Sequence, residues 1–218
     1  MKLVWDLPLD PAGVIVELDG DVRARIRPGR PGDGPALRGA FERFSEESRY
    51  FRFFTPTPRM SPQAEENLTA VDDHRQYAWG VFDPDQPSEV GDESGLAIAA
   101  ARLFIDAEAP TIAEATLAVV DDYQGRGLGG LLMELLISTG AILELDILRF
   151  DVLVENRPMR SVLARLGASG RSLPDDRSIM RYDLPVPEGE VDPTIGALYL
   201  LLRAAAGVEA TVIDPLND

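Results

Sequence analysis

Glycines alternate with Arg126 and Leu128 in the segment QGRGLGG, residues 124–130, and an apolar helical pattern follows directly. The first amides of a helix have no acceptor within the helix, and they carry partial positive charge. Because glycines have no side chains, an anion can approach these amides closely, and Arg126 adds a full positive charge. The segment therefore predicts a binding site for a phosphate or pyrophosphate group.

Two well-known glycine-rich motifs differ from this segment in spacing or in context. A P-loop requires a lysine after its glycines, and this segment has none, which excludes that motif. Gly125, Gly127 and Gly130 fit the G-x-G-x-x-G spacing of dinucleotide-binding loops, but they follow the fourth or fifth expected strand instead of opening a β-α-β unit. A simple tight turn remains an alternative, although turns seldom need so many glycines beside an arginine.

A single carboxylate, Glu114, lies in the otherwise unpolar segment IAEATLAVV, residues 112–120. If this segment is a strand, alternation puts Glu114 on one face together with Thr116, Ala118 and Val120. Its carboxylate is then either exposed at the start of the strand or placed there for a function, and the strand pattern alone leaves both alternatives open.

The elements around these residues indicate a mixed fold of strands and helices. Asp19-Gly20 separates two alternating runs and predicts a hairpin, Ser61-Pro62 predicts the start of a helix, and Gly167 predicts the end of one. Strands are expected within residues 14–29, 76–82, 95–105, 112–120, 147–154 and 178–184, and helices within 30–54, 61–72, 128–145, 156–167 and 194–207. This order is typical of the α/β and α+β classes.

Composition narrows the classes of function. The 218 residues are 45% hydrophobic and 27% charged, which is ordinary for a globular protein. The formal net charge of −16 disfavours nucleic acid and anionic membranes as partners, and it favours a cationic partner. With no cysteine and only one histidine, His74, the chain offers no thiolate nucleophile, disulfide or Cys- or His-based metal set, so we expect no metal. No leader or membrane-spanning stretch is visible, and we expect a cytoplasmic protein.

The segment that begins at Gln124 resembles the Q/R-x-x-G-x-G/A pyrophosphate loop of the GNAT acyltransferase superfamily. Residues 113–136 are similar to that family's fourth strand, loop and third helix, and residues 151–168 to its fifth strand and the helix that follows. Residues 25–62 resemble the opening of the bacterial protein lysine acetyltransferase (Pat-like) branch. The resemblance extends over roughly residues 20 to 185.

This resemblance implies a mixed, twisted sheet that splays between the family's fourth and fifth strands, with acetyl-CoA in the cleft and no metal. It implies that the backbone of Val119, Val120 and Asp121 contacts the pantetheine arm. Asn156, after the fifth strand, matches an asparagine that contacts the cofactor, although a helix N-cap is an alternative or additional role. The pyrophosphate is then expected on the amides of Gln124, Gly125, Arg126, Gly127, Leu128, Gly129 and Gly130.

The implied reaction is the attack of an amine on a thioester. A lysine amine with a pKa near 10.4 is almost fully protonated at pH 7, so a general base is needed. The resemblance gives this role to Glu114, acting through a water, because Glu114 lies ~16 Å along the strand from Val119. Many relatives carry a tyrosine as general acid after the fifth strand, but Leu163 lies in the corresponding stretch here, and no general acid is assigned.

Three segments are expected: an N-terminal strand or extension at 1–20, the acetyltransferase domain at 21–185, and a C-terminal extension with one helix at 186–218. The extension is expected to pack on the domain or on another subunit, as in a homodimer. The expected acceptor is a protein lysine ε-amine. A small free amine is a second candidate, and a non-catalytic acetyl-CoA sensor is a third.

Overall fold

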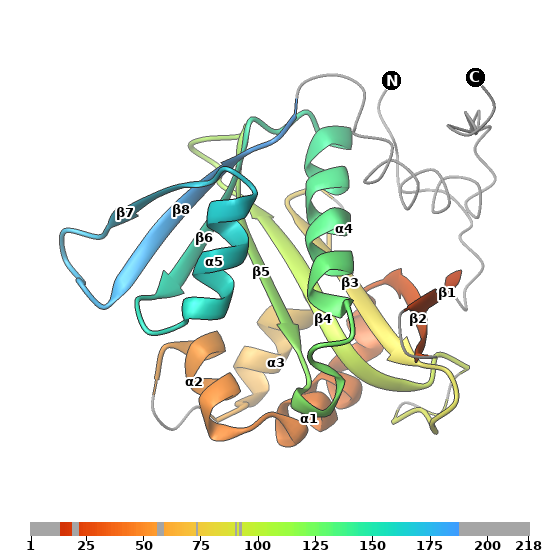
Figure 1. Ribbon diagram of the computed structural model, residues 1–218. Helices are drawn as coiled ribbons and strands as arrows, with labels where there is room; N and C mark the ends of the chain where they lie inside the picture. The colour runs from red at the N-terminus through yellow and green to blue at the C-terminus, as the bar shows by residue number, and fades with distance from the viewer. Residues whose placement is uncertain are drawn as a thin grey trace, which may run out of the picture.

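The computed structural model describes residues 14–18, 22–55, 59–72, 74–89, 91 and 93–187 of the chain. Within them, eight strands form one mixed sheet in the order β1-β2-β3-β4-β5-β6-β8-β7 (Figure 1). The strands are β1 (Val14–Leu18), β2 (Val22–Pro28), β3 (Gln76–Asp83), β4 (Leu96–Ile105), β5 (Ile112–Val119), β6 (Ile147–Leu153), β7 (Ser169–Ser172) and β8 (Ile179–Pro185).

Helices cover both faces of this sheet. The helices are α1 (Gly34–Arg43), α2 (Glu46–Phe53), α3 (Pro62–Thr69), α4 (Leu128–Ile142) and α5 (Arg157–Arg165), with short 3-10 turns at Pro31–Asp33 and Asp121–Tyr123.

Neighbouring residues of β3 show how the two faces are filled. Val81 belongs to the large core beneath the leucine-rich face of α4, whereas Phe82 packs with Ala36 and Ala40 of α1 on the opposite face. Burial of these apolar side chains on both sides fixes the sheet between α4 and α1.

The central feature of the sheet is an incomplete pairing between β5 and β6. β4 and β5 are antiparallel over their whole common length, from Ile105↔Ala113 to Ala99↔Val119. By contrast, β5 and β6 are parallel partners only at 112–114 and 147–149. Beyond Glu114 the two strands diverge, as Figure 1 shows. The predicted mixed sheet with a splay between these two strands is thus confirmed.

Local signals in the sequence account for several boundaries. Leu18 pairs with Val22 across the predicted hairpin, and the Ser61 hydroxyl caps α3 by accepting from the Ala64 amide at 3.1 Å. Gly167, with φ of 84°, follows α5 in the left-handed region that favours glycine.

One strand, β7, was not predicted. Its four residues, SGRS, are all exposed and show no alternation of apolar and polar side chains. Pairing with β8 holds them, together with an ion pair of 2.8 Å between Arg171 and Asp183. Because these contacts come from a separate segment, the local propensity of the four residues gave no signal.

The expected domain boundaries at residues 20 and 185 stay predictions, although β1 joins the same sheet as β2. The helix expected at 194–207 lies outside the described residues. Among the helices that the structure describes, none has the length and apolar character to cross a membrane.

A splayed sheet and an adjoining pocket as the candidate active site

Two glycines in the loop after β5 have backbone conformations that glycine adopts without strain and other residues rarely adopt. Gly125 has φ of 74° and Gly127 has φ of 86°, both in the left-handed region. Gly127 is the N-cap of α4, and its carbonyl accepts the first helical hydrogen bond from the Leu131 amide at 3.1 Å. The tight turn that the sequence left as an alternative therefore accounts for these two glycines.

Gly129 and Gly130 are not required by the turn. They lie in the first turn of α4 with φ values outside the left-handed region, and a Cβ atom added at either would meet nothing within 4 Å. Neither backbone conformation nor packing requires glycine here. The backbone amides of Leu128, Gly129 and Gly130 belong to the first turn of α4 and have no acceptor within the helix. The Arg126 guanidinium carbon lies 5.3 Å from the centroid of the Tyr123 ring. Together, the three amides and the Arg126 guanidinium form a set of donors that fits an anionic group.

The loop is fastened to the beginning of α2. The Asp121 carboxylate accepts from the Ser45 amide at 2.8 Å, the Ser45 hydroxyl at 2.6 Å and the Ser48 hydroxyl at 2.9 Å. The Gln124 side-chain amide donates to the Ser48 hydroxyl at 3.2 Å and to the Val119 carbonyl at 3.1 Å. Sequence reasoning selected the backbone of Asp121 and did not foresee that its side chain holds α2.

These hydrogen bonds determine the ionisation of Asp121. Burial raises the pKa of its carboxyl, but the hydrogen bonds from Ser45 and Ser48 favour the charged form and leave the pKa below its ordinary value. Asp121 is therefore an anion that stabilises the N-terminus of α2.

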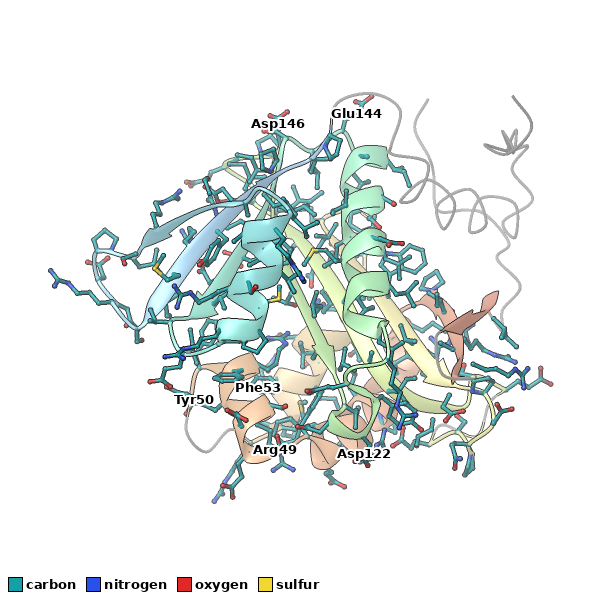
Figure 2. All side chains as sticks on the ribbon, in the orientation of Figure 1. Arg49, Tyr50, Phe53, Asp122, Glu144 and Asp146 are labelled. Carbon is teal, nitrogen blue, oxygen red and sulfur yellow. The ribbon has the colours of Figure 1, made fainter. Side chains whose placement is uncertain are left out.

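Contacts from the middle and the end of α2 hold this helix against α1. Arg49 donates to the Phe41 carbonyl at 3.1 Å, and the Phe53 ring meets the Phe41 ring edge-on at 5.4 Å. Figure 2 shows Arg49 and Phe53 on α2. The position of Arg52, which lies between them in the chain, is thereby fixed.

The free edge of β5 offers backbone hydrogen bonds to a ligand. The Val120 amide donates to the Ile98 carbonyl of β4 at 2.9 Å. Because backbone groups alternate along an antiparallel strand, those of Leu117 and Val119 point away from β4 and into the splay. An extended chain can therefore bind there as an added strand would.

The structure confirms one of the two roles expected for Asn156, that of a helix N-cap. It is the N-cap of α5, and its side-chain oxygen accepts from the Met159 amide at 3.1 Å. Since β5 and β6 are parallel, the loops after them lie at the same end of the sheet, so Asn156 and the glycine loop follow the two strands that diverge. Contact of Asn156 with a cofactor stays a prediction.

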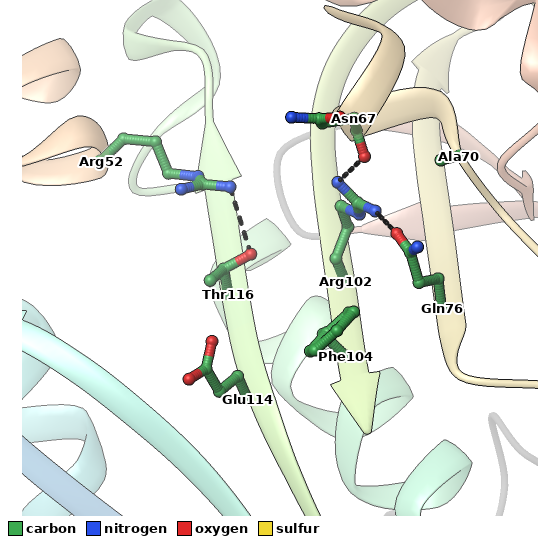
Figure 3. Close-up of a pocket in the computed structure, with 8 residues that line it drawn as sticks. All are labelled: Arg52, Asn67, Ala70, Gln76, Arg102, Phe104, Glu114 and Thr116. Atoms are coloured by element: carbon green, nitrogen blue, oxygen red, sulfur yellow. Dashed lines mark hydrogen bonds between the residues drawn. The ribbon is translucent and has the colours of Figure 1, made fainter. Parts of the chain in front are cut away.

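A pocket of about 390 Å³ opens beside the point where the splay begins (Figure 3). Glu114 is the last residue of β5 that pairs with β6, and it lies opposite Phe104 on β4. Thr116 lies opposite Arg102 in the same ladder. The lining residues are Arg52 from α2, Asn67 from α3, Ala70, Gln76 from β3, Arg102 and Phe104 from β4, and Glu114 and Thr116 from β5.

The Glu114 carboxylate is exposed and accepts no hydrogen bond from the residues that the structure describes. Its cationic neighbours on β6 and β8 are held by other acids. Arg149, its partner in the ladder, donates to Asp183 at 2.7 Å, and Arg181 donates to Asp151 at 2.6 Å. Glu114 is thus exposed and also lines the pocket, and its placement for a function stays a prediction.

The charge of Glu114 nevertheless affects the pKa of Arg181 on β8. The hydrogen bond to Asp151 is the main cause that raises the pKa of Arg181, and the charge of Glu114 adds to it. A carboxylate in this position is available to a polar group that enters the pocket.

Both arginines of the pocket were missed by sequence reasoning. Arg102 interrupts the apolar run of β4 as Glu114 interrupts that of β5, which was the signal available. Arg52 lies among aromatic residues, and nothing in its segment indicated a pocket residue. His74 is exposed and does not line the pocket. Leu163, which lies where many relatives carry a tyrosine, is fully buried and offers no acid.

The sequence matches the model of the Acetyltransferase (GNAT) family over residues 45–168, which include α2, the pocket, the splay and the glycine loop. The chain belongs to the GNAT family. This family uses acyl-CoA, and the membership confirms the fold and the acyltransferase class that the resemblance implied.

Individual relatives agree with this assignment. The chain is 32% identical over 172 residues to the acetyltransferase Pat of Mycolicibacterium smegmatis, a match that covers 77% of this chain and 47% of that protein. It is similar to the crystal structure of the GNAT domain of S. lividans PAT, with a TM-score of 0.68 and 25% identity over 80% of this chain and 97% of that one. A cAMP-binding acyltransferase from Mycobacterium smegmatis gives a TM-score of 0.57 and 26% identity, covering 89% and 53%. The chain thus spans about half the length of the curated Pat protein.

The fastening of the loop to α2 can be tested with Asp121→Asn. We expect this GNAT chain to lose about 1 kcal/mol of unfolding free energy at pH 7, because a neutral amide caps α2 more weakly. A group with a depressed folded-state pKa stabilises above its unfolded value, 3.8, and the contribution disappears as pH falls through the folded-state pKa. The difference between the two proteins in urea unfolding should therefore shrink below about pH 4.

Asp122→Asn is the matched control. Asp122 is the exposed neighbour of Asp121 (Figure 2), and its removal should leave stability unchanged. Equal losses from the two substitutions would contradict the role given to Asp121.

Proposed function

We propose that this chain is an acetyl-CoA-dependent N-acetyltransferase that transfers an acetyl group to a lysine ε-amine of a protein, with Glu114 as general base. The observation that carries the proposal is the position of Glu114. It is the last residue of β5 that pairs with β6, it lines the pocket, and its strand leads into the glycine loop. Membership of the GNAT family supplies the class of reaction.

The cleft offers distinct groups to each part of the co-substrate. The amides of Leu128, Gly129 and Gly130, and the charge of Arg126, suit the pyrophosphate. The outward backbone groups of Val119 suit the amides of the pantetheine arm, and there the Gln124 side chain must share or release the Val119 carbonyl. The thioester then lies along β5 toward Glu114. We infer that Asn156 borders the opposite side of the arm.

Before it can attack, the protonated acceptor amine must lose one proton. Glu114 takes it, through a water where the distance demands one, and the neutral nitrogen attacks the thioester carbonyl carbon. The C–N bond forms, the C–S bond breaks, and the electron pair leaves on the sulfur of CoA. Outward amides of β5 donate to the carbonyl oxygen while it carries negative charge. The nitrogen releases its second proton to water as the amide forms, and water supplies the proton that the thiolate finally takes.

The choice of a protein lysine rests on the relatives. The similar proteins of Mycolicibacterium smegmatis and S. lividans carry the name Pat, and the Pat-like branch is the one that the opening of the chain resembles. The net charge of −16 favours a cationic acceptor surface.

Glu114→Gln tests the base. We expect kcat to fall by about 10² to 10⁴, because the amide cannot accept the proton, while the Kd for acetyl-CoA in calorimetry changes little. The remaining rate should rise about tenfold per pH unit below pH 10, since it follows the fraction of neutral amine. Glu108→Gln, in the exposed turn after β4, is the control and should leave kcat unchanged.

The acceptor is identified in the same assay by CoA thiol release with lysine-containing proteins and, separately, with free amines. Release with proteins supports the proposal. Release with free amines alone would replace the protein acceptor by a small molecule, and tight acetyl-CoA binding without any release would replace the enzyme by a sensor. Equal kcat for wild type and Glu114→Gln would remove Glu114 as the base.

Gly129→Ala separates the needs of the cofactor from those of the fold. Alanine in the first turn of α4 should raise the unfolding free energy by up to about 1 kcal/mol, since glycine is a poor helix former and the added Cβ meets no atom. The same Cβ occupies the space over the helix N-terminus and should weaken acetyl-CoA binding several-fold in calorimetry. Unchanged affinity in the stabilised variant would show that the pyrophosphate binds elsewhere.

A further inference from the structure

The pocket beside Glu114 contains two arginines whose hydrogen bonds all go to neutral groups. Arg52 donates to the Thr116 hydroxyl at 3.3 Å. Arg102 donates to the Asn67 carbonyl at 3.1 Å and to the Gln76 side-chain oxygen at 2.8 Å. Figure 3 shows both guanidinium groups reaching into the pocket from different elements. Among the residues that the structure describes, neither forms an ion pair.

Acids that could match these charges are abundant in the chain. Asp and Glu outnumber Lys and Arg by 37 to 21, and four buried or partly buried arginines outside the pocket are matched with acids. Arg27 is held by Asp33, Arg43 by Glu89, Arg149 by Asp183 and Arg181 by Asp151. Arg25, Arg49 and Arg160 are also partly buried without an ion pair among the described residues, but of these unpaired arginines only Arg52 and Arg102 line the pocket.

Leaving these two charges unmatched has an electrostatic cost. Burial lowers the pKa of Arg52 to about 10, and the positive charge of Arg102 contributes to this shift. Burial also lowers the pKa of Arg102. Both guanidinium groups are therefore destabilised as cations, and an anion placed between them would relieve their desolvation and their mutual repulsion.

The ladder between β4 and β5 gives the distance from this pair to the base. Arg102 lies opposite Thr116 in the ladder, and the Thr116 hydroxyl accepts from Arg52, so both arginines lie beside the same rung. Glu114 lies two residues further along the same face of β5, which is about 7 Å. An anion at the arginines and an amine at Glu114 are therefore separated by a distance that one amino acid side chain can span.

We propose that Arg52 and Arg102 form an anion subsite that binds a carboxylate of the amine acceptor while its amine is held at Glu114. The inference rests on the proposed function, in which the acceptor is a protein lysine, and it then assigns the carboxylate to an acidic residue next to that lysine. A free acceptor with the same spacing of amine and carboxylate shares this chemistry.

The local field of the pocket explains why such a residue is selected. The whole chain is strongly acidic and favours basic protein surfaces, but the lining of the pocket contains two arginines and one carboxylate, Glu114. The acceptor segment therefore combines a lysine for the base with an adjacent acid for the subsite.

The test compares two pairs of acceptors by kcat/KM from CoA thiol release. The first pair is a lysine peptide with glutamates on both sides of the lysine and the same peptide with glutamines. The second pair is Nα-acetyl-lysine and N-acetylcadaverine, which differ only by the carboxylate. We expect wild type to prefer the acidic member by roughly tenfold or more, as hydrogen bonds between charged groups allow.

Arg52→Gln and Arg102→Gln should each abolish most of this preference. Arg102→Lys keeps the charge and should retain part of it. Arg23→Gln, which removes an exposed arginine paired with Asp85, is the control for loss of one positive charge and should keep the full preference. If Arg102→Gln does not fold, because Asn67 and Gln76 lose a donor, Arg52→Gln alone decides the result.

The outcomes separate this inference from the proposed function. Equal kcat/KM for the two peptides in wild type overturns the subsite and leaves protein lysine acetylation intact. If neither peptide reacts, but the enzyme prefers Nα-acetyl-lysine to N-acetylcadaverine and this preference depends on the arginines, the subsite is supported and the protein acceptor is overturned. A preference that survives Arg52→Gln and Arg102→Gln overturns the subsite, and so does turnover of neither pair.

Discussion

The whole site depends on the place where β5 and β6 stop pairing. Hydrogen bonds join these strands only as far as Glu114 and Arg149, and beyond this rung each strand is held by its outer neighbour alone. The splay exposes backbone groups of β5 that a continuous sheet would use internally. It also places Glu114 where the pairing ends and the glycine loop and the cap of α5 after the two diverging strands, so a single interruption of the ladder creates both the splay and the edge that carries the proposed base.

Electrostatics then divides this opening into regions of different character. On the β6 side, Arg149 and Arg181 are held by Asp183 and Asp151, so Glu114 remains available although two cations are near it. At the far end of β5, the bare first turn of α4 and Arg126 form a positive region. The Asp121 carboxylate joins these parts by fixing the start of α2 to the same loop.

The sequence predicted the features that depend on local pattern. The hairpin at Asp19-Gly20, the α3 cap at Ser61 and the glycine-opened α4 follow from turn and cap chemistry, and the family pattern placed the splay. Contacts between distant segments were not predictable. Arg52 meets Thr116 across 64 positions and Asp121 meets Ser45 across 76, and β7 is held by long-range pairing of four polar residues. No periodicity within one segment encodes such contacts.

The most direct test of the cleft is hydrogen exchange of the backbone amides with and without saturating acetyl-CoA. We expect slower exchange in residues 115–119 and 124–131, because the pantetheine arm and the pyrophosphate accept hydrogen bonds there, and unchanged exchange in the β7–β8 hairpin. Protection confined to other segments, or absent at saturation, would contradict the claim that the opening between β5 and β6 is the acyl-CoA site.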